Sequence, residues 1–497
     1  MTIPLRAVLV VALSTALGPR CLSATPASCD RLTDLSIPNT VIASAVREPS
    51  SDVCSVKLIS RPVPDSEIGV EIWLPPAEKW NGKFLGTGNG GYSGDLSYSA
   101  MKSALEKGYA VAGSDTGHQG GDLKFGSGHP EKIDDWGYRA VHIMTETAKL
   151  VIRNYYGRFA AEAYFSGCST GGHQALSEAQ RYPSDYDGIL AGDPGNNRVR
   201  LNVGFLWSWK ATNGGPELPF PPSKLPMLNK AVIAACDELD GVRDGVIGDP
   251  SGCKFDPSSL LCKGADGPAC LTASEAAAVR KVYDGAHNPR TGERLYAGWV
   301  PGSEAGWAGY FVGHPEPARL DFWRYWVFDN TAWDPLTFDF DRDVAYTDTK
   351  MAAVIANESD LKAFEQHKGK LILYQGWADP VVPPDDTIRY FESVEKAMGR
   401  AHARDFMRLF MVPGMGHCGG GPGSASFDAL SALDAWVSRN VAPDRITAAH
   451  LQNGVASYTR PLCPFPQVAR PRVQGSTDKA EDFVCSTGAI GTKGRRE

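Results

Sequence analysis

The feature that most constrains this chain is the pentapeptide Gly167-Cys168-Ser169-Thr170-Gly171, which occurs once in 497 residues. An apolar segment, residues 163–165, precedes it, and a segment with helical character, residues 174–183, follows it. A strand that turns into a helix at G-x-S-x-G is the context of a nucleophile elbow, where the helix N-terminus favours developing negative charge. Glycines suit so tight a turn because side chains there would clash with neighbouring backbone. The motif therefore predicts Ser169 as a nucleophile, with a Gly/Ser turn without chemistry as the alternative.

The pattern of apolar residues predicts an α/β fold. Strand-like runs alternate with helical ones before the serine and again near the C-terminus, with strands expected at 56–63, 68–75, 82–88, 109–117, 163–168, 370–376 and 405–413 and helices at 138–157, 174–183 and 428–440. Between them, Trp, Pro and Gly are frequent and the alternation stops. We therefore expect an α/β-hydrolase fold with a large lid domain, residues 197–345, inserted after the nucleophile strand and helix. The catalytic domain would comprise 25–196 and 346–497.

A serine nucleophile needs a base, and the base needs an orienting acid. In α/β hydrolases these follow in the order serine, acid, histidine. Asp379 directly follows the apolar run 370–376, and His417 lies in a loop after the next apolar run. The other nine histidines lie before the serine, beside it, in the insertion or away from strand ends. The order predicts a triad of Ser169, Asp379 and His417.

Two backbone N–H groups are expected to form the oxyanion hole. The residue after the nucleophile supplies one, which here is Thr170. A glycine-rich loop at 88–91 follows an expected strand and brings backbone close to a substrate. We favour Gly90 or Gly91 as the second donor, with a simple hairpin turn as the alternative.

The N-terminus and the cysteines predict export. Residues 1–24 combine Arg6 with a short apolar run at 8–18, which is typical of a signal peptide and too short to span a bilayer. Ten cysteines remain after it, an even number that suggests disulfides. The chain has no CxxC pair, which argues against zinc. Cys168 precedes the serine and Cys418 follows the histidine, so a contact between Ser169 and His417 would bring these cysteines within disulfide reach. We expect a secreted or periplasmic protein.

Residues 236–249 hold closely spaced carboxylates with no histidine among them, and Cys236 starts the segment. Hard oxygen ligands of this kind suit Ca²⁺, although the spacing is not that of an EF-hand. A solvated acidic turn is the alternative. A catalytic metal site is disfavoured by the lack of histidine ligands.

These motifs jointly resemble the tannase and feruloyl esterase family, which includes mono(2-hydroxyethyl) terephthalate hydrolase. The resemblance covers nearly the whole mature chain and rests on the segments 88–94, 114–118, 135–142, 164–176, 236–250, 376–380, 413–418 and 460–467. It implies a structural Ca²⁺ held by the side chains of Asp237, Asp240 and Asp244 and the carbonyls of Val242 and Val246. Counting and adjacency, supported by the resemblance, give five disulfides, which are Cys29–Cys54, Cys168–Cys418, Cys236–Cys253, Cys262–Cys270 and Cys463–Cys485.

The sequence as a whole is interpreted as a secreted serine esterase acting on esters of aromatic carboxylic acids. Its substrate would be a small aromatic ester, either free or attached to plant polysaccharide or polyphenol. A feruloyl ester is the first choice, and a galloyl ester or mono(2-hydroxyethyl) terephthalate is the alternative. An inactive, calcium-stapled secreted binding protein is the non-enzyme alternative. The net charge of −7 gives no electrostatic reason to expect nucleic acid, and no later apolar stretch predicts a membrane span.

Overall fold

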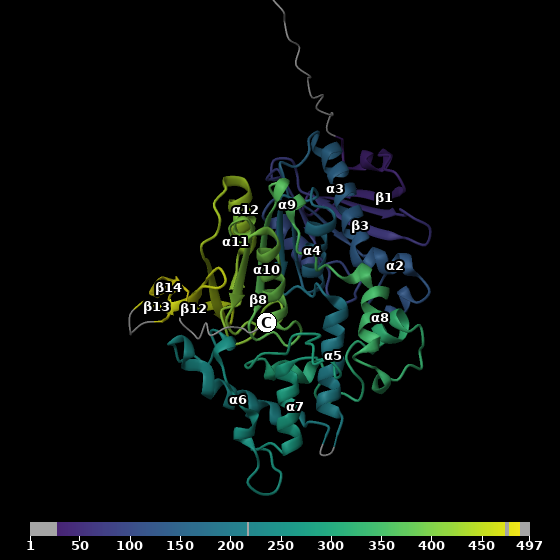
Figure 1. Ribbon diagram of the computed structural model, residues 1–497. Coiled ribbons are helices and arrows are strands. Elements are labelled where there is room, and N and C mark those ends of the chain that lie inside the picture. The colour runs from purple at the N-terminus through teal and green to yellow at the C-terminus, as the bar shows by residue number, and fades with distance from the viewer. Residues whose placement is uncertain (1–26, 216–217, 473–476, 488–497) are drawn as a thin grey trace, which may run out of the picture.

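The computed structural model describes residues 27–215, 218–472 and 477–487, so the expected signal segment 1–24 lies outside the described residues. A nine-stranded sheet with the order β1-β2-β3-β5-β4-β6-β7-β8-β9 forms the centre of the molecule (Figure 1). The strands are β1 (Thr40–Arg47), β2 (Cys54–Ser60), β3 (Ile68–Leu74), β4 (Lys83–Thr87), β5 (Ala110–Ser114), β6 (Glu162–Cys168), β7 (Gly188–Gly192), β8 (Lys370–Gly376) and β9 (Met407–Val412). The pairs β1–β2, β2–β3 and β3–β5 are antiparallel. The remaining pairs of this sheet, which are β5–β4, β4–β6, β6–β7, β7–β8 and β8–β9, are parallel.

Helices cover both faces of the sheet. Because neighbouring residues of a strand point to opposite faces, adjacent side chains pack in different cores. Phe84 packs in a core with helices α3 (Ala140–Tyr156), α4 (Thr170–Arg181) and α10 (Pro384–Met398). Leu85 packs instead with α1 (Tyr98–Glu106) and α12 (Ala429–Arg439). The remaining helices of the sheet domain are α2 (Pro130–Asp134), α9 (Lys362–Gln366) and α11 (Arg400–Phe406). The parallel strands, with the G-x-S-x-G turn between β6 and α4, confirm the predicted α/β-hydrolase fold.

Every expected strand and helix is present, with ends that differ by a few residues. The sequence analysis did not identify β1 or β7. Strand β1 lies at the sheet edge and alternates between half-buried and exposed positions, so its apolar pattern is weak. Strand β7 is a fully buried five-residue run that begins and ends with glycine, and glycine is unusual inside a strand. Strand β7 matters because Asp193, the residue directly after it, lies in the candidate site.

The segment between β7 and β8 contributes a second core. It contains α5 (Arg198–Asn213), α6 (Leu225–Cys236), α7 (Ala273–Asp284) and α8 (Arg342–Lys350), and Figure 1 shows α5, α6 and α7 gathered at one end of the sheet. Its apolar side chains pack with Tyr92 and Trp136 of the sheet domain. The aromatic residues Trp307, Phe322, Trp323 and Trp326 of this segment are all at most 2% exposed, so they belong to this core.

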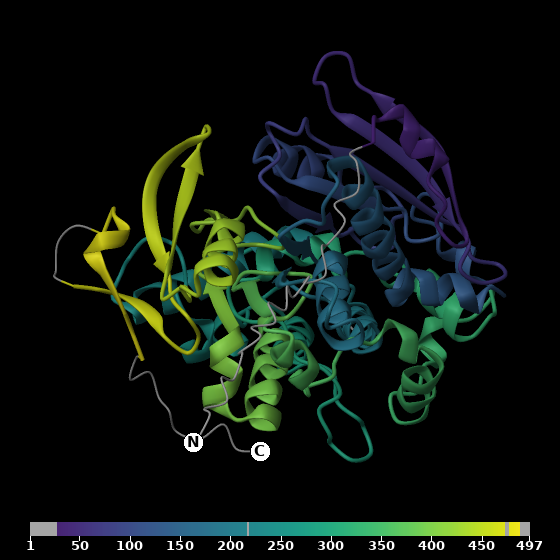
Figure 2. The same cartoon turned by 90° about the horizontal axis from the view of Figure 1, so that it is seen from above.

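The C-terminal part of the chain, from residue 426, contributes two small sheets beside α12. Strands β10 (Ser426–Phe427), β11 (Ile446–Gln452) and β12 (Val455–Leu462) make one, and β13 (Val468–Pro471) pairs with β14 (Phe483–Ser486) in the other. Figure 2 shows the β11–β12 hairpin standing out from the body. Four local disulfides join Cys29–Cys54, Cys236–Cys253, Cys262–Cys270 and Cys463–Cys485. None of the helices in the described residues is both long and apolar enough to cross a bilayer.

Candidate active site

Ser169 stands on a strained turn between β6 and α4. Its φ of 64° and ψ of −115° lie outside the regions that a non-glycine residue normally adopts. The turn closes because its flanking residues lack side chains: a Cβ on Gly167 would lie 2.5 Å from the backbone of Gly171, and one on Gly172 would lie 2.4 Å from the carbonyl of Gly192. The N–H of Ser169 donates to that same carbonyl at 2.9 Å. The predicted elbow is therefore built by backbone contacts that only glycine permits.

Asp379 and His417 meet at the carboxyl ends of β8 and β9. Nδ1 of His417 lies 2.8 Å from Oδ2 of Asp379. The carboxylate of Asp379 is fully buried and also accepts the N–H groups of Val381 and Val382 and the side-chain amide of Gln375. These donors fix the carboxylate, and the bond to Nδ1 leaves Nε2 of the imidazole free to accept a proton.

A disulfide joins the serine turn to the histidine loop. Cys168 and Cys418 are bonded with a Cα–Cα distance of 5.9 Å, although they lie 250 residues apart in sequence. Because Cys168 precedes Ser169 and Cys418 follows His417, the bond brings the predicted nucleophile and base into one neighbourhood. All five disulfides of the described chain are the expected ones.

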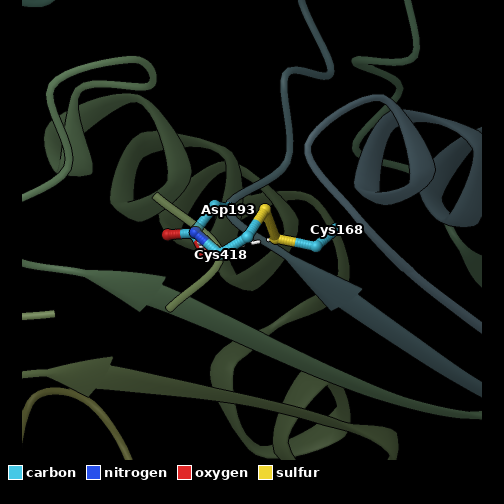
Figure 3. Close-up of side chains that lie close together, drawn as sticks. All are labelled: Cys168, Asp193 and Cys418. Atoms are coloured by element: carbon cyan, nitrogen blue, oxygen red, sulfur yellow. Dashed lines mark hydrogen bonds between the residues drawn. A yellow bond between two sulfur atoms is a disulfide. The ribbon is translucent and has the colours of Figure 1, made fainter. Parts of the chain in front are cut away.

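Asp193, which the sequence analysis missed, lies beside this disulfide (Figure 3). Its carboxyl is fully buried and accepts the N–H of Gly376 at 2.7 Å and that of Cys418 at 3.0 Å. Burial raises the pKa of Asp193 well above its ordinary value, and the nearby charge of Asp379 adds to the effect. Asp193 thus ties the end of β8 to the histidine loop. The signal in the sequence was a carboxylate directly after a short run with glycine at both ends, residues 188–192.

The glycine-rich loop lies against the start of α4. The carbonyl of Asn89 accepts the N–H of Gly171 at 2.8 Å, and the N–H of Asn89 donates to Gln174 at 3.0 Å. The N–H groups of Gly90 and Gly91 donate no hydrogen bond to any described residue, as the oxyanion role requires. Close packing demands glycine at Gly88, where a Cβ would lie 2.5 Å from Gly171, whereas Gly91 needs it for a φ of 57°.

His173, the histidine nearest to Ser169 in sequence, is excluded as the base by its contacts. Its Nε2 lies 2.9 Å from the carbonyl of Gly137 and its Nδ1 lies 3.3 Å from that of Asn196. Burial lowers its pKa to about 4, and the charge of Arg198 adds to the effect. His173 is therefore a buried structural histidine.

The acidic loop between Cys236 and Cys253 has the donor chemistry expected of a Ca²⁺ site. Asp237 accepts the N–H groups of Asp244, Gly245 and Val246, and Asp244 also pairs with Arg460 at 2.9 Å. Burial raises the pKa of Asp240 to about 6, and the charges of Asp244 and Asp237 contribute. A cation would relieve this repulsion, so the residues fit the ion. In the described residues the ligand atoms of the three carboxylates do not all come within 4.8 Å of one another.

Comparisons with known proteins agree with this site. The family model described as tannase and feruloyl esterase matches residues 53–486. An uncharacterized esterase of Xanthomonas campestris pv. campestris is 39% identical over 532 residues, covering 92% of this chain and 91% of that protein. Mono(2-hydroxyethyl) terephthalate hydrolase of Piscinibacter sakaiensis is 33% identical over 488 residues, with coverages of 83% and 80%. The crystal structure of feruloyl esterase B from Aspergillus oryzae superposes with a TM-score of 0.85 at 28% identity, covering 92% and 99%.

The fold and these relatives define the chain as a carboxylic ester hydrolase of the α/β-hydrolase class. The chain belongs to the tannase and feruloyl esterase family, which confirms the resemblance seen in its motifs.

Replacing both Cys168 and Cys418 with alanine should reduce kcat about 100-fold and change KM much less. A shift of about 1 Å between catalytic groups costs on the order of 10²-fold in rate, whereas substrate contacts elsewhere persist. Steady-state kinetics below the unfolding temperature test this. The matched control is the Cys262→Ala/Cys270→Ala variant, which should lose stability but keep kcat. Equal kcat losses in both variants would contradict a role specific to the Cys168–Cys418 bond.

Proposed function

We propose that this protein is an exported serine esterase in which Ser169, His417 and Asp379 form the catalytic triad. The observation that carries the proposal is the pairing of two contacts. The His417–Asp379 hydrogen bond of 2.8 Å orients the base, and the Cys168–Cys418 disulfide holds the base beside the nucleophile. Five disulfides support an oxidising location, because such bonds persist mainly outside the cytosol.

In the proposed reaction, Oγ of Ser169 attacks the ester carbonyl while Nε2 of His417 takes the hydroxyl proton of Ser169. Asp379 stabilises the imidazolium that forms. The carbonyl oxygen becomes an oxyanion, which the N–H of Thr170 and that of Gly90 or Gly91 stabilise. His417 then returns the proton to the leaving alcohol, which leaves an acyl-enzyme on Ser169. Water then attacks the acyl-enzyme while His417 takes its proton. His417 returns the proton to Oγ of Ser169, and the acid is released.

The proposed substrates are esters of aromatic carboxylic acids. The names of the relatives support this class, because ferulic and terephthalic acids are both aromatic. We place feruloyl esters first and galloyl esters second.

Ser169→Ala should lower kcat by roughly 10⁴-fold or more while the protein remains folded, because triad members act as a unit. The kcat of His417→Ala should be similarly low. A fluorophosphonate probe should label the wild type once, at Ser169, and leave Ser169→Ala unlabelled. Circular dichroism checks that each variant is folded. Turnover by Ser169→Ala at even a tenth of the wild-type rate would disprove the assignment.

Among methyl ferulate, methyl gallate and mono(2-hydroxyethyl) terephthalate, we expect the highest kcat/KM for methyl ferulate. Initial rates at matched enzyme concentrations provide the comparison, with Ser169→Ala as the blank for spontaneous hydrolysis. A higher kcat/KM for the gallate or terephthalate ester would contradict the proposed preference for feruloyl esters and would indicate a preference for esters of that acid. Absence of turnover on all three esters, together with an unlabelled Ser169, would favour the inactive binding protein.

We also propose a structural Ca²⁺ at the acidic loop, held by the side chains of Asp237, Asp240 and Asp244 and the carbonyls of Val242 and Val246. The oxygen-only donor set and the repulsion at Asp240 support it. The loop belongs to the segment inserted between β7 and β8, so the ion would stabilise that segment and take no part in the chemistry.

Chelation with EDTA should lower the melting temperature of the wild type. The Asp240→Ala variant should already have a low melting temperature, which EDTA should not change. A ligand at about 100 times its Kd stabilises the folded state by about 2.7 kcal/mol, which chelation removes. Asp256→Asn, an exposed lid carboxylate paired with Arg280, is the control and should respond like the wild type. An unchanged wild-type melting temperature, with no calcium found by elemental analysis, would rule out the site.

A further inference from the structure

Arg198, the first residue of α5, is a buried cation close to the predicted oxyanion hole. Its side chain is fully buried, and its guanidinium carbon lies 5.3 Å from the ring centres of both Tyr92 and Trp136. Burial lowers the pKa of Arg198 to about 10, so the group stays positively charged at neutral pH. The nearby charge of Arg319 lowers the pKa further.

The guanidinium contacts the oxyanion residues through one hydroxyl. Nη2 of Arg198 donates to Oγ1 of Thr170 at 2.7 Å, and the Thr170 hydroxyl donates in turn to the carbonyl of Gly91 at 2.5 Å. A threonine hydroxyl has one proton and two lone pairs, so it accepts the first bond and donates the second. This relay therefore joins the two segments expected to supply the oxyanion donors, the start of α4 and the glycine-rich loop.

Apart from the two aromatic rings, the rest of the guanidinium has no polar partner among the described residues. Nε and Nη1 of Arg198 are buried without a hydrogen-bond partner, and no carboxylate forms an ion pair with Arg198 among the described residues. A buried charge without a counter-charge is costly, and removing it often stabilises a protein. Within the part of the chain that the structure describes, the Thr170 contact is the one hydrogen bond made by the guanidinium, so the benefit that offsets the cost is expected there.

We propose that Arg198 is a positioning residue for the oxyanion hole, acting through Thr170. The relay fixes Gly91 relative to the N–H of Thr170, and its positive charge favours the negative oxygen of the tetrahedral intermediate. Such a charge is effective here because the surroundings are apolar. This inference rests on the proposed function, since it assumes that Ser169 is the nucleophile and that Thr170 donates to the oxyanion.

The test compares Arg198→Gln, Thr170→Val and the double variant with the wild type. Each single variant should lower kcat about 10- to 100-fold with a small change in KM, which is at or below the loss from removing one oxyanion donor. The double variant should resemble the worse single variant, because both changes break the same relay. Phenylboronic acid, which forms a tetrahedral anionic adduct with serine, should bind each variant more weakly by a similar factor.

Three further variants separate positioning from packing. Thr170→Ser keeps the hydroxyl and should recover most of the kcat that Thr170→Val loses, and Arg198→Lys keeps the charge and should recover part of the loss in Arg198→Gln. Arg408→Gln removes a partly buried guanidinium that lies 5.0 Å from the ring centre of Trp436, away from the site, and should affect stability alone. If Arg198→Gln does not fold, the comparison of Arg198→Lys with Thr170→Val and Thr170→Ser decides the question.

Losses that multiply in the double variant, or boronate affinity that stays at the wild-type value, would overturn the relay. So would a Thr170→Val variant with wild-type kcat. An active wild type with inactive Ser169→Ala, combined with any of these results, rejects the relay and keeps the proposed triad. Ser169→Ala that retains activity rejects the proposed function itself.

Discussion

The tight turn at Ser169 sets the positions of the segments around it. A φ of 64° at the serine is held because glycine backbones approach from two sides: Gly171 and Gly172 in α4 meet the loop that contains Gly88 and the end of β7. Strain of this kind costs about 1–3 kcal/mol and persists only where the surroundings over-determine it. The same contacts that hold the turn also bring the glycine-rich loop beside the nucleophile. The position of the proposed nucleophile and that of the proposed oxyanion hole are therefore consequences of one packing arrangement.

Charge is distributed unevenly across the site. Two buried carboxyl groups, Asp379 and Asp193, lie near His417, and burial together with the charge of Asp379 raises the pKa of Asp193. The guanidinium of Arg198 lies instead against Thr170, at the start of α4. A reaction that develops positive charge on the imidazole and negative charge on the substrate oxygen matches this polarity. Because the groups are buried, their fields are weakly screened.

Local patterns were enough to predict the fold and most of the site. The elbow, the Asp379 loop and the His417 loop each follow an apolar strand, so order along the chain located them. Asp193 and Arg198 were missed for a different reason. Asp193 follows a strand too short and too rich in glycine to recognise, and Arg198 is an arginine in the first turn of a helix, a place usually exposed to water. Their burial depends on tertiary packing between β7, α4 and the inserted segment, which a single sequence does not display.

The bond between Cys168 and Cys418 closes a covalent loop that contains the whole inserted segment. The two halves of the site are thus made on different sides of a long stretch of chain, and the bond that unites them forms only once both cysteines are oxidised. Chains kept in a reducing compartment have the residues for ester hydrolysis without this cross-link. Under the proposed function, hydrolytic activity would therefore depend on oxidation, and newly made chains would be poor enzymes until they reached an oxidising compartment.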